Sequence, residues 1–117
     1  MHEMSLAQNI IEILDEVLRE HPEYHIQKVS VDIGELIAVV PESLEFCYTA
    51  ITQGSPLEGS ELNINIVPIQ VFCRPCQKEF QLDSFLFICP QCGGTDLEEI
   101  SGRELLVKNI DVNLSET

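Results

Sequence analysis

Apolar residues recur every three or four positions over residues 5–19, which predicts an amphipathic helix. Ser5 and Gln8 have the spacing of a capping box, so we expect residues 1–4 to precede the first helical turn. His21 and Pro22 then end the helix. We expect one buried stripe along it, made of Leu6, Ile10, Ile13, Leu14, Val17 and Leu18.

A second helix is predicted to begin at Pro41, because a proline ring suits the first helical position. Gly54 is a typical helix terminator. The apolar face of this helix consists of Leu44, Cys47, Tyr48 and Ile51. We expect Cys47 to be a small buried hydrophobic residue, neither a metal ligand nor a nucleophile.

Three other segments alternate between apolar and polar residues or are rich in β-formers, which predicts strands near residues 26–33, 61–67 and 104–112. From residue 71 to about residue 97 both periodicities fade, and cysteine, proline, glycine and aromatic residues dominate. The element order predicts an α+β fold, with two helices packed on a three-stranded sheet and a small zinc-ribbon-like module inserted before the last strand. We expect the α+β domain to comprise residues 1–70 and 101–117, and the module to comprise residues 71–100.

The module contains two CxxC pairs, Cys73 with Cys76 and Cys89 with Cys92. Each pair forms a tight turn, and two such turns complete a tetrahedron of thiolates, so these four residues are predicted to bind a metal. Zinc is favoured, and we expect a structural role, since a closed four-thiolate site leaves no position for substrate. Iron in a rubredoxin-like electron carrier is the alternative with the same ligands.

The charge balance restricts the partners of the chain. It has 20 acidic residues against 6 Lys and Arg, a formal net charge of −14. Such a field repels nucleic acid and anionic membranes, which opposes the reading of the cysteines as a nucleic-acid-binding or other zinc-ribbon interaction module. No export signal or membrane-spanning stretch is visible, so we expect a cytoplasmic protein. No catalytic motif stands out, so we expect no enzyme.

The first three residues form a second candidate metal site. The amine of Met1, the backbone nitrogen and imidazole of His2, and the carboxylate of Glu3 can chelate one ion. We expect Met1 to be retained before the bulky His2, which keeps its amine at this position. Nitrogen-rich sets of this kind suit Ni²⁺ or Cu²⁺.

Taken in order, MHEMS, VSVDIGEL, PESLEFCY, CRPC and CPQCGG resemble the HypA/HybF family of nickel metallochaperones over essentially the whole chain. The resemblance implies that Met1, His2 and Glu3 bind Ni(II) transiently, with His2 as the essential ligand. It also implies that Cys73, Cys76, Cys89 and Cys92 hold a structural Zn(II).

The same resemblance implies a function and partners. The expected function is delivery of nickel for maturation of nickel-iron hydrogenase. The expected partners are the accessory GTPase of that pathway and the precursor of the hydrogenase large subunit. Proteins of urease maturation are alternative clients.

Overall fold

The computed structural model describes residues 2–114, which fold into two compact units. The first unit contains the residues up to Val31, Val39–Ile64 and the residues from Val107 onward. The second unit contains Asp32–Ala38 and Asn65–Leu106. The second unit therefore includes all of the expected cysteine module, residues 71–100. No helix within residues 2–114 is long and apolar enough to cross a membrane.

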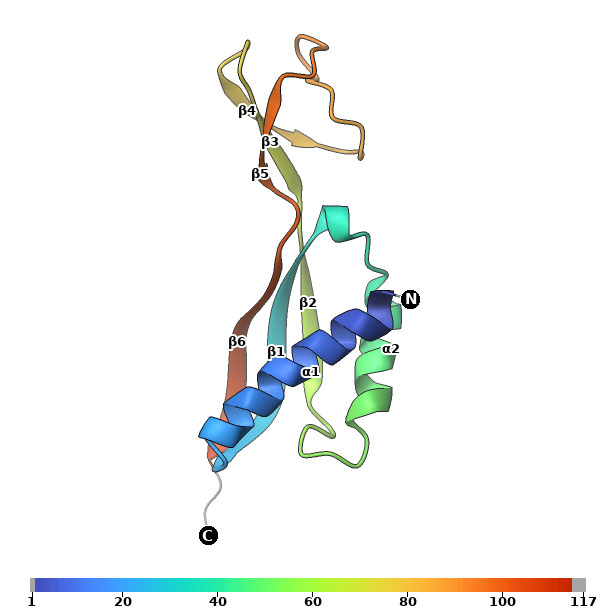
Figure 1. The fold of residues 1–117 in the computed structure, drawn as a ribbon, viewed down its shortest axis with the longest axis vertical. Helices are drawn as coiled ribbons and strands as arrows, with labels where there is room; N and C mark the ends of the chain where they lie inside the picture. Colours follow the sequence, from blue (N-terminus) through green and yellow to red (C-terminus); the bar gives the residue numbers. More distant parts are fainter. Residues whose placement is uncertain (1, 115–117) are drawn as a thin grey trace. The chain divides into compact units, whose positions relative to one another are not determined.

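The predicted α+β fold class is confirmed. Helices α1 (His2–Glu20) and α2 (Pro41–Thr52) belong to the first unit and pack against each other (Figure 1). The strands β1 (Tyr24–Gly34), β2 (Glu61–Val67) and β6 (Leu105–Leu114) form a three-stranded sheet in the order β2-β1-β6. All three correspond to strands expected from the sequence.

The core of the first unit follows the predicted apolar positions closely. The buried side chains come from both helices and from β1, and they include Leu6, Ile10, Leu14, Val29, Val31, Leu44 and Tyr48. The expectation for Ile13 was wrong, because its side chain is 44% exposed, while Ala7 is fully buried. Cys47 is buried, as predicted. The hydrophobic effect thus buries one face of each helix in this core, where the two helices contact each other.

The expected start of α1 was also wrong, because the helix begins at His2 and Ser5 lies inside it. Glu3 lies in the first turn, where a carboxylate interacts favourably with the positive end of the helix dipole. Its Oε2 also accepts a hydrogen bond from the backbone N–H of Val40, at 3.2 Å. These interactions favour three more helical residues over a capping box at Ser5 and Gln8.

The second unit contains a sheet that the sequence pattern did not predict. Strands β3 (Ile69–Cys73), β4 (Lys78–Leu82) and β5 (Leu97–Ser101) form an antiparallel sheet in the order β4-β3-β5. Its small core consists of Ile69, Val71 and Leu82, with Leu36, Phe80, Phe87 and Leu97 packed against it. The faded periodicity after residue 71 therefore concealed three short strands.

Gly34 and Gly102 allow two backbone segments of the second unit to approach closely. A Cβ atom on Gly34 would lie 2.0 Å from the carbonyl oxygen of Gly102. The N–H of Gly34 donates to the carbonyl of Glu104, and that of Leu36 donates to the carbonyl of Gly102, both at 2.8 Å. These bonds connect the end of β1 and the 3-10 helix η1 (Glu35–Ile37) to the segment that leads into β6. A glycine is required at position 34 because any side chain would collide with backbone.

Candidate metal sites

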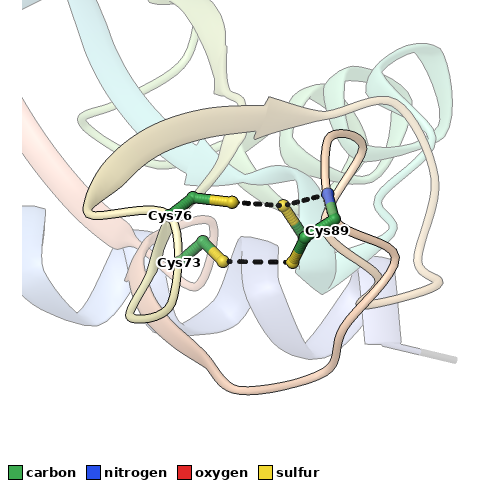
Figure 2. A group of neighbouring side chains, drawn as sticks. Cys73, Cys76 and Cys89 are labelled. Carbon is green, nitrogen blue, oxygen red and sulfur yellow. Dashed lines mark hydrogen bonds between the residues drawn. The ribbon is translucent and has the colours of Figure 1, made fainter.

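The four cysteines of the CxxC pairs converge in the second unit. One ligand atom from each of Cys73, Cys76, Cys89 and Cys92 lies within 4.8 Å of the others. Figure 2 shows the sulfur atoms of Cys73 and Cys76 directed toward the turn that carries Cys89. Within residues 2–114, no other group of three or more histidine, cysteine or acidic side chains is close enough to share an ion.

The sulfur spacing fits a tetrahedral metal site. The Sγ atoms of Cys73 and Cys92 are 3.7 Å apart, and those of Cys76 and Cys89 are 3.8 Å apart. A tetrahedron with zinc–sulfur bonds of about 2.3 Å has sulfur–sulfur edges of about 3.8 Å. These two sulfur–sulfur distances therefore match the edges of a tetrahedral zinc site, and all four sulfur atoms lie within 4.8 Å of one another.

Backbone N–H groups surround the sulfur atoms of the second CxxC turn. The N–H groups of Gln91 and Cys92 donate to Cys89 Sγ, and that of Gly94 donates to Cys92 Sγ, each at 3.4 Å. Gly93 has a φ of 73°, which the tight turn needs and glycine adopts without strain. Such bonds orient sulfur ligands and stabilise negative charge on them.

The thiols have unequal affinities for protons. The hydrogen bond from the N–H of Cys92 is the main cause that lowers the pKa of Cys89 to about 6. Burial acts in the opposite direction, and the N–H of Gln91 lowers the pKa further. Burial and the neighbouring thiols raise the pKa of Cys76 to about 12. Four thiolates repel one another at this distance, so their joint ionisation needs a cation between them. The cluster is therefore built to hold its full negative charge only around a metal.

Arg74, between the first two cysteines, is paired with carboxylates of its own unit. Its guanidinium donates to Asp96 Oδ1 at 2.7 Å and to Glu98 Oε1 at 3.3 Å. These carboxylates raise the pKa of Arg74, and Asp96 has the larger effect. A cation already paired in this way is poorly available to a phosphate backbone, which further opposes the nucleic-acid reading of the module.

The N-terminal candidate residues lie at the start of α1 in the first unit. His2 Nε2 is 3.2 Å from Glu3 Oε2, and the side chains are 51% and 15% exposed. The hydrogen bond from Val40 is the main cause of a lowered pKa for Glu3. The imidazole and the carboxylate are thus adjacent, and the carboxylate is held in its charged form. Met1, the third predicted residue of this site, lies outside the described residues.

Val40 contributes a hydrogen bond to the N-terminal candidate site, which the sequence did not predict. It supplies a backbone N–H to Glu3 from 37 positions away along the chain. No side-chain type marks such a donor, so only the fold reveals it. His21, at the other end of α1, stacks on Tyr24 and lies 3.5 Å from Glu23.

Comparison with known proteins places the chain in a family. Residues 1–112 match the family described as "Hydrogenase/urease nickel incorporation, metallochaperone, hypA". The hydrogenase maturation factor HypA of Acidithiobacillus ferrooxidans is 39% identical over 112 residues, covering 96% of this chain and 99% of the relative. HypA of Geotalea uraniireducens is 38% identical over 112 residues, with the same coverage of both chains.

Solved structures share the fold. The solution structure of a HypA protein aligns with a TM-score of 0.70 at 20% identity, over 97% of both chains. That of the Ni metallochaperone HypA from Helicobacter pylori aligns with a TM-score of 0.64 at 20% identity, over 97% of this chain and 98% of that one. With the family match over residues 1–112 and relatives near 38% identity, the chain belongs to the HypA family of nickel-incorporation metallochaperones.

Proposed function

We propose that the protein binds Ni(II) at its N-terminus and delivers it for maturation of nickel-iron hydrogenase. The ligands in this proposal are the amine of Met1, the backbone nitrogen and imidazole of His2, and the carboxylate of Glu3. The observation that carries it is the adjacency of the His2 imidazole and the Glu3 carboxylate, 3.2 Å apart, in a member of a nickel-incorporation family.

The position of His2 at the first residue of α1 supports a role for its backbone nitrogen. The first four N–H groups of an α-helix have no acceptor within the helix, so this nitrogen can bind a metal without breaking a helical hydrogen bond. An amine, an amide nitrogen and an imidazole are the ligand types that suit a tetragonal Ni²⁺ site.

The exposure of His2 supports release as well as binding. Half of its side chain is accessible to solvent, so a partner can approach the ion and replace one ligand at a time. A buried site ligated only by this chain would exchange nickel slowly. Protons compete with the metal for nitrogen ligands, so affinity falls as the pH falls. We infer a carrier that is not itself an enzyme.

In the same proposal, Cys73, Cys76, Cys89 and Cys92 bind a structural Zn(II). The module of residues 71–100 is then the zinc-binding part, and residues 1–70 with 101–117 form the nickel-binding domain. The sulfur spacing and the N–H groups donated to the thiols support this assignment. Metal analysis of untagged protein separates zinc from iron, because a four-thiolate iron site is red and a zinc site is colourless.

The partners that we propose are the accessory GTPase of hydrogenase maturation and the hydrogenase large-subunit precursor, in the cytoplasm. Proteins of urease maturation are alternative clients, since the family description names both enzymes. The net charge of −14 makes nucleic acid and anionic membranes poor partners.

Nickel titration of untagged His2→Ala tests the function. We expect nickel affinity to fall by at least about a hundredfold with zinc content unchanged, because loss of a ligand should cost at least as much as the roughly 10–100-fold caused by loss of an outer-shell partner. His21→Ala is the matched control, because His21 is similarly exposed at the opposite end of the same helix. Equal nickel affinity in the wild type and in His2→Ala would refute the proposed site.

A further inference from the structure

The first unit carries a groove between the start of α1 and the start of α2, apart from the cysteine cluster. Its volume is about 590 Å³, and its lining residues are Glu3, Met4, Glu42, Ser43, Phe46 and Cys47. Phe46 is 74% exposed, which is unusual for a large aromatic side chain. Aromatic side chains are enriched in the contact surfaces of protein interfaces, so an exposed phenylalanine beside a groove is a candidate contact for a partner.

The lining of the groove is apolar at its centre and acidic at its rim. Glu42 and Phe46 are four positions apart on α2, and so are Ser43 and Cys47, so all four lie on one helix face. Met4 and the largely buried Glu3 come from the first turn of α1. None of the six lining residues is basic, so the groove offers apolar contact beside two acidic side chains.

We propose that this groove is the docking site for a basic, amphipathic peptide segment of a partner protein. Such a segment would place an apolar side chain, such as leucine, against Phe46 and Met4. Lysine or arginine side chains three or four positions away would then reach the carboxylates of Glu42 and Glu3. Aromatic anchors with charged neighbours are the usual centres of binding energy in protein interfaces.

Charge decides among the occupants of the groove. A second copy of this chain would bring the same acidic rim and another net charge of −14, so like charges oppose self-association through this face. Binding of a basic amphipathic segment is favoured twice, because the segment buries Phe46 and neutralises the acidic rim. The site also adjoins His2 through Glu3, so a docked segment lies next to the proposed nickel ligands. Docking itself requires no nickel.

Three synthetic helical peptides test the proposal on the zinc-loaded, nickel-free full chain. The first presents two leucines flanked by lysines, the second replaces each lysine by glutamate, and the third replaces each leucine by alanine. We expect only the first to bind at low salt, with NMR shift changes centred on residues 3–4 and 42–47. Binding should weaken as salt screens the charges.

Matched variants identify the surface. Phe46→Ser should weaken binding by at least about tenfold, as expected for an anchor residue. Phe85→Ser should leave binding unchanged, because Phe85 is also exposed, at 58%, but lies in the second unit. Glu42→Lys should weaken binding more than Glu45→Lys, which makes the same charge change at an exposed position outside the groove. Circular dichroism checks that each variant stays folded.

Several results would overturn the proposal. They are the absence of binding by the leucine–lysine peptide, equal binding of all three peptides, and equal effects of Phe46→Ser and Phe85→Ser. A concentration-dependent dimer that Phe46→Ser dissociates would also overturn it, because the occupant would then be a second copy of the chain. Failure of nickel binding in His2→Ala leaves these outcomes unchanged, so the two proposals fail separately.

Discussion

Glu3 makes two contacts of different kinds through one carboxylate oxygen. Oε2 lies 3.2 Å from His2 Nε2 and also accepts the N–H of Val40. The first contact belongs to the proposed nickel site, and the second connects the start of α1 to the residue that precedes α2. A single residue therefore couples the position of the proposed N-terminal nickel ligands to the packing of the two helices.

The pKa of Glu3 gives a prediction at the residue scale. The Val40 hydrogen bond lowers this pKa below its ordinary value of 4.5, so the bond stabilises the folded state above that pH and is lost as the pH falls through the lowered pKa. We expect the amide NMR shift of Val40 in metal-free protein to show the transition caused by Glu3 protonation only below pH 4.5.

Glu3→Gln is the control for this titration. A glutamine keeps an acceptor oxygen but does not ionise, so the Val40 shift should lose its acid transition. A transition that persists in Glu3→Gln would assign it to another group and contradict the prediction. The same variant should reduce nickel affinity less than His2→Ala, because it retains every nitrogen ligand.

At the scale of elements, α1 begins at His2, so the proposed nickel ligands lie at the N-terminal end of a helix. Residues added before Met1 convert its amine into an amide, which is a far weaker ligand until it is deprotonated. We expect an N-terminal extension to reduce nickel affinity by at least about tenfold, the lower end of what loss of a site contact costs. Isothermal titration of N-terminally and C-terminally tagged proteins measures this, and equal affinities would exclude the amine as a ligand.

The helices and the strands of the first sheet were predictable because their apolar residues repeat over many positions. Val29, Val31 and Ile33, for example, are all buried, as their alternation indicates. The strands of the second unit were missed because each has only five residues and the cysteines and turns obscure the pattern. Ile69, Val71 and Cys73 do alternate and are buried, so a weak signal for β3 was present.

The candidate metal ligands were predictable to different degrees. The CxxC spacing predicts four convergent thiols because the chemistry requires that spacing, and the structure brings the sulfurs together. The contact between Glu3 and Val40 depends on the packing of α1 against α2, which no local pattern encodes. The groove beside Phe46 was missed for the same reason, since its two sides are distant in sequence.

At the scale of the whole molecule, the two units should respond differently to metal removal. The core of the second unit around Ile69, Val71 and Leu82 is small, and such modules need a metal to fold. The first unit has a larger core of its own. Chelation of zinc should therefore abolish the NMR dispersion of β3, β4 and β5, while the helical circular dichroism of α1 and α2 persists.

Two cysteine variants provide the comparison for this experiment. Cys76→Ser should lose metal and reproduce the effect of chelation, whereas Cys47→Ala should keep its metal, because Cys47 lies outside the cluster. Hydrogen exchange of the amides in β3 measures the outcome. Protection that survives complete removal of metal would show that the second unit folds without it.

The order of strands in the first sheet also has a consequence for synthesis of the protein. The ribosome makes α1 first, but β6 (Leu105–Leu114), which pairs with β1, comes after the whole cysteine module. During translation His2 and Glu3 therefore emerge long before the first sheet is complete. The first sheet can therefore be completed only at the end of translation, after all four cysteines of the CxxC pairs have been made.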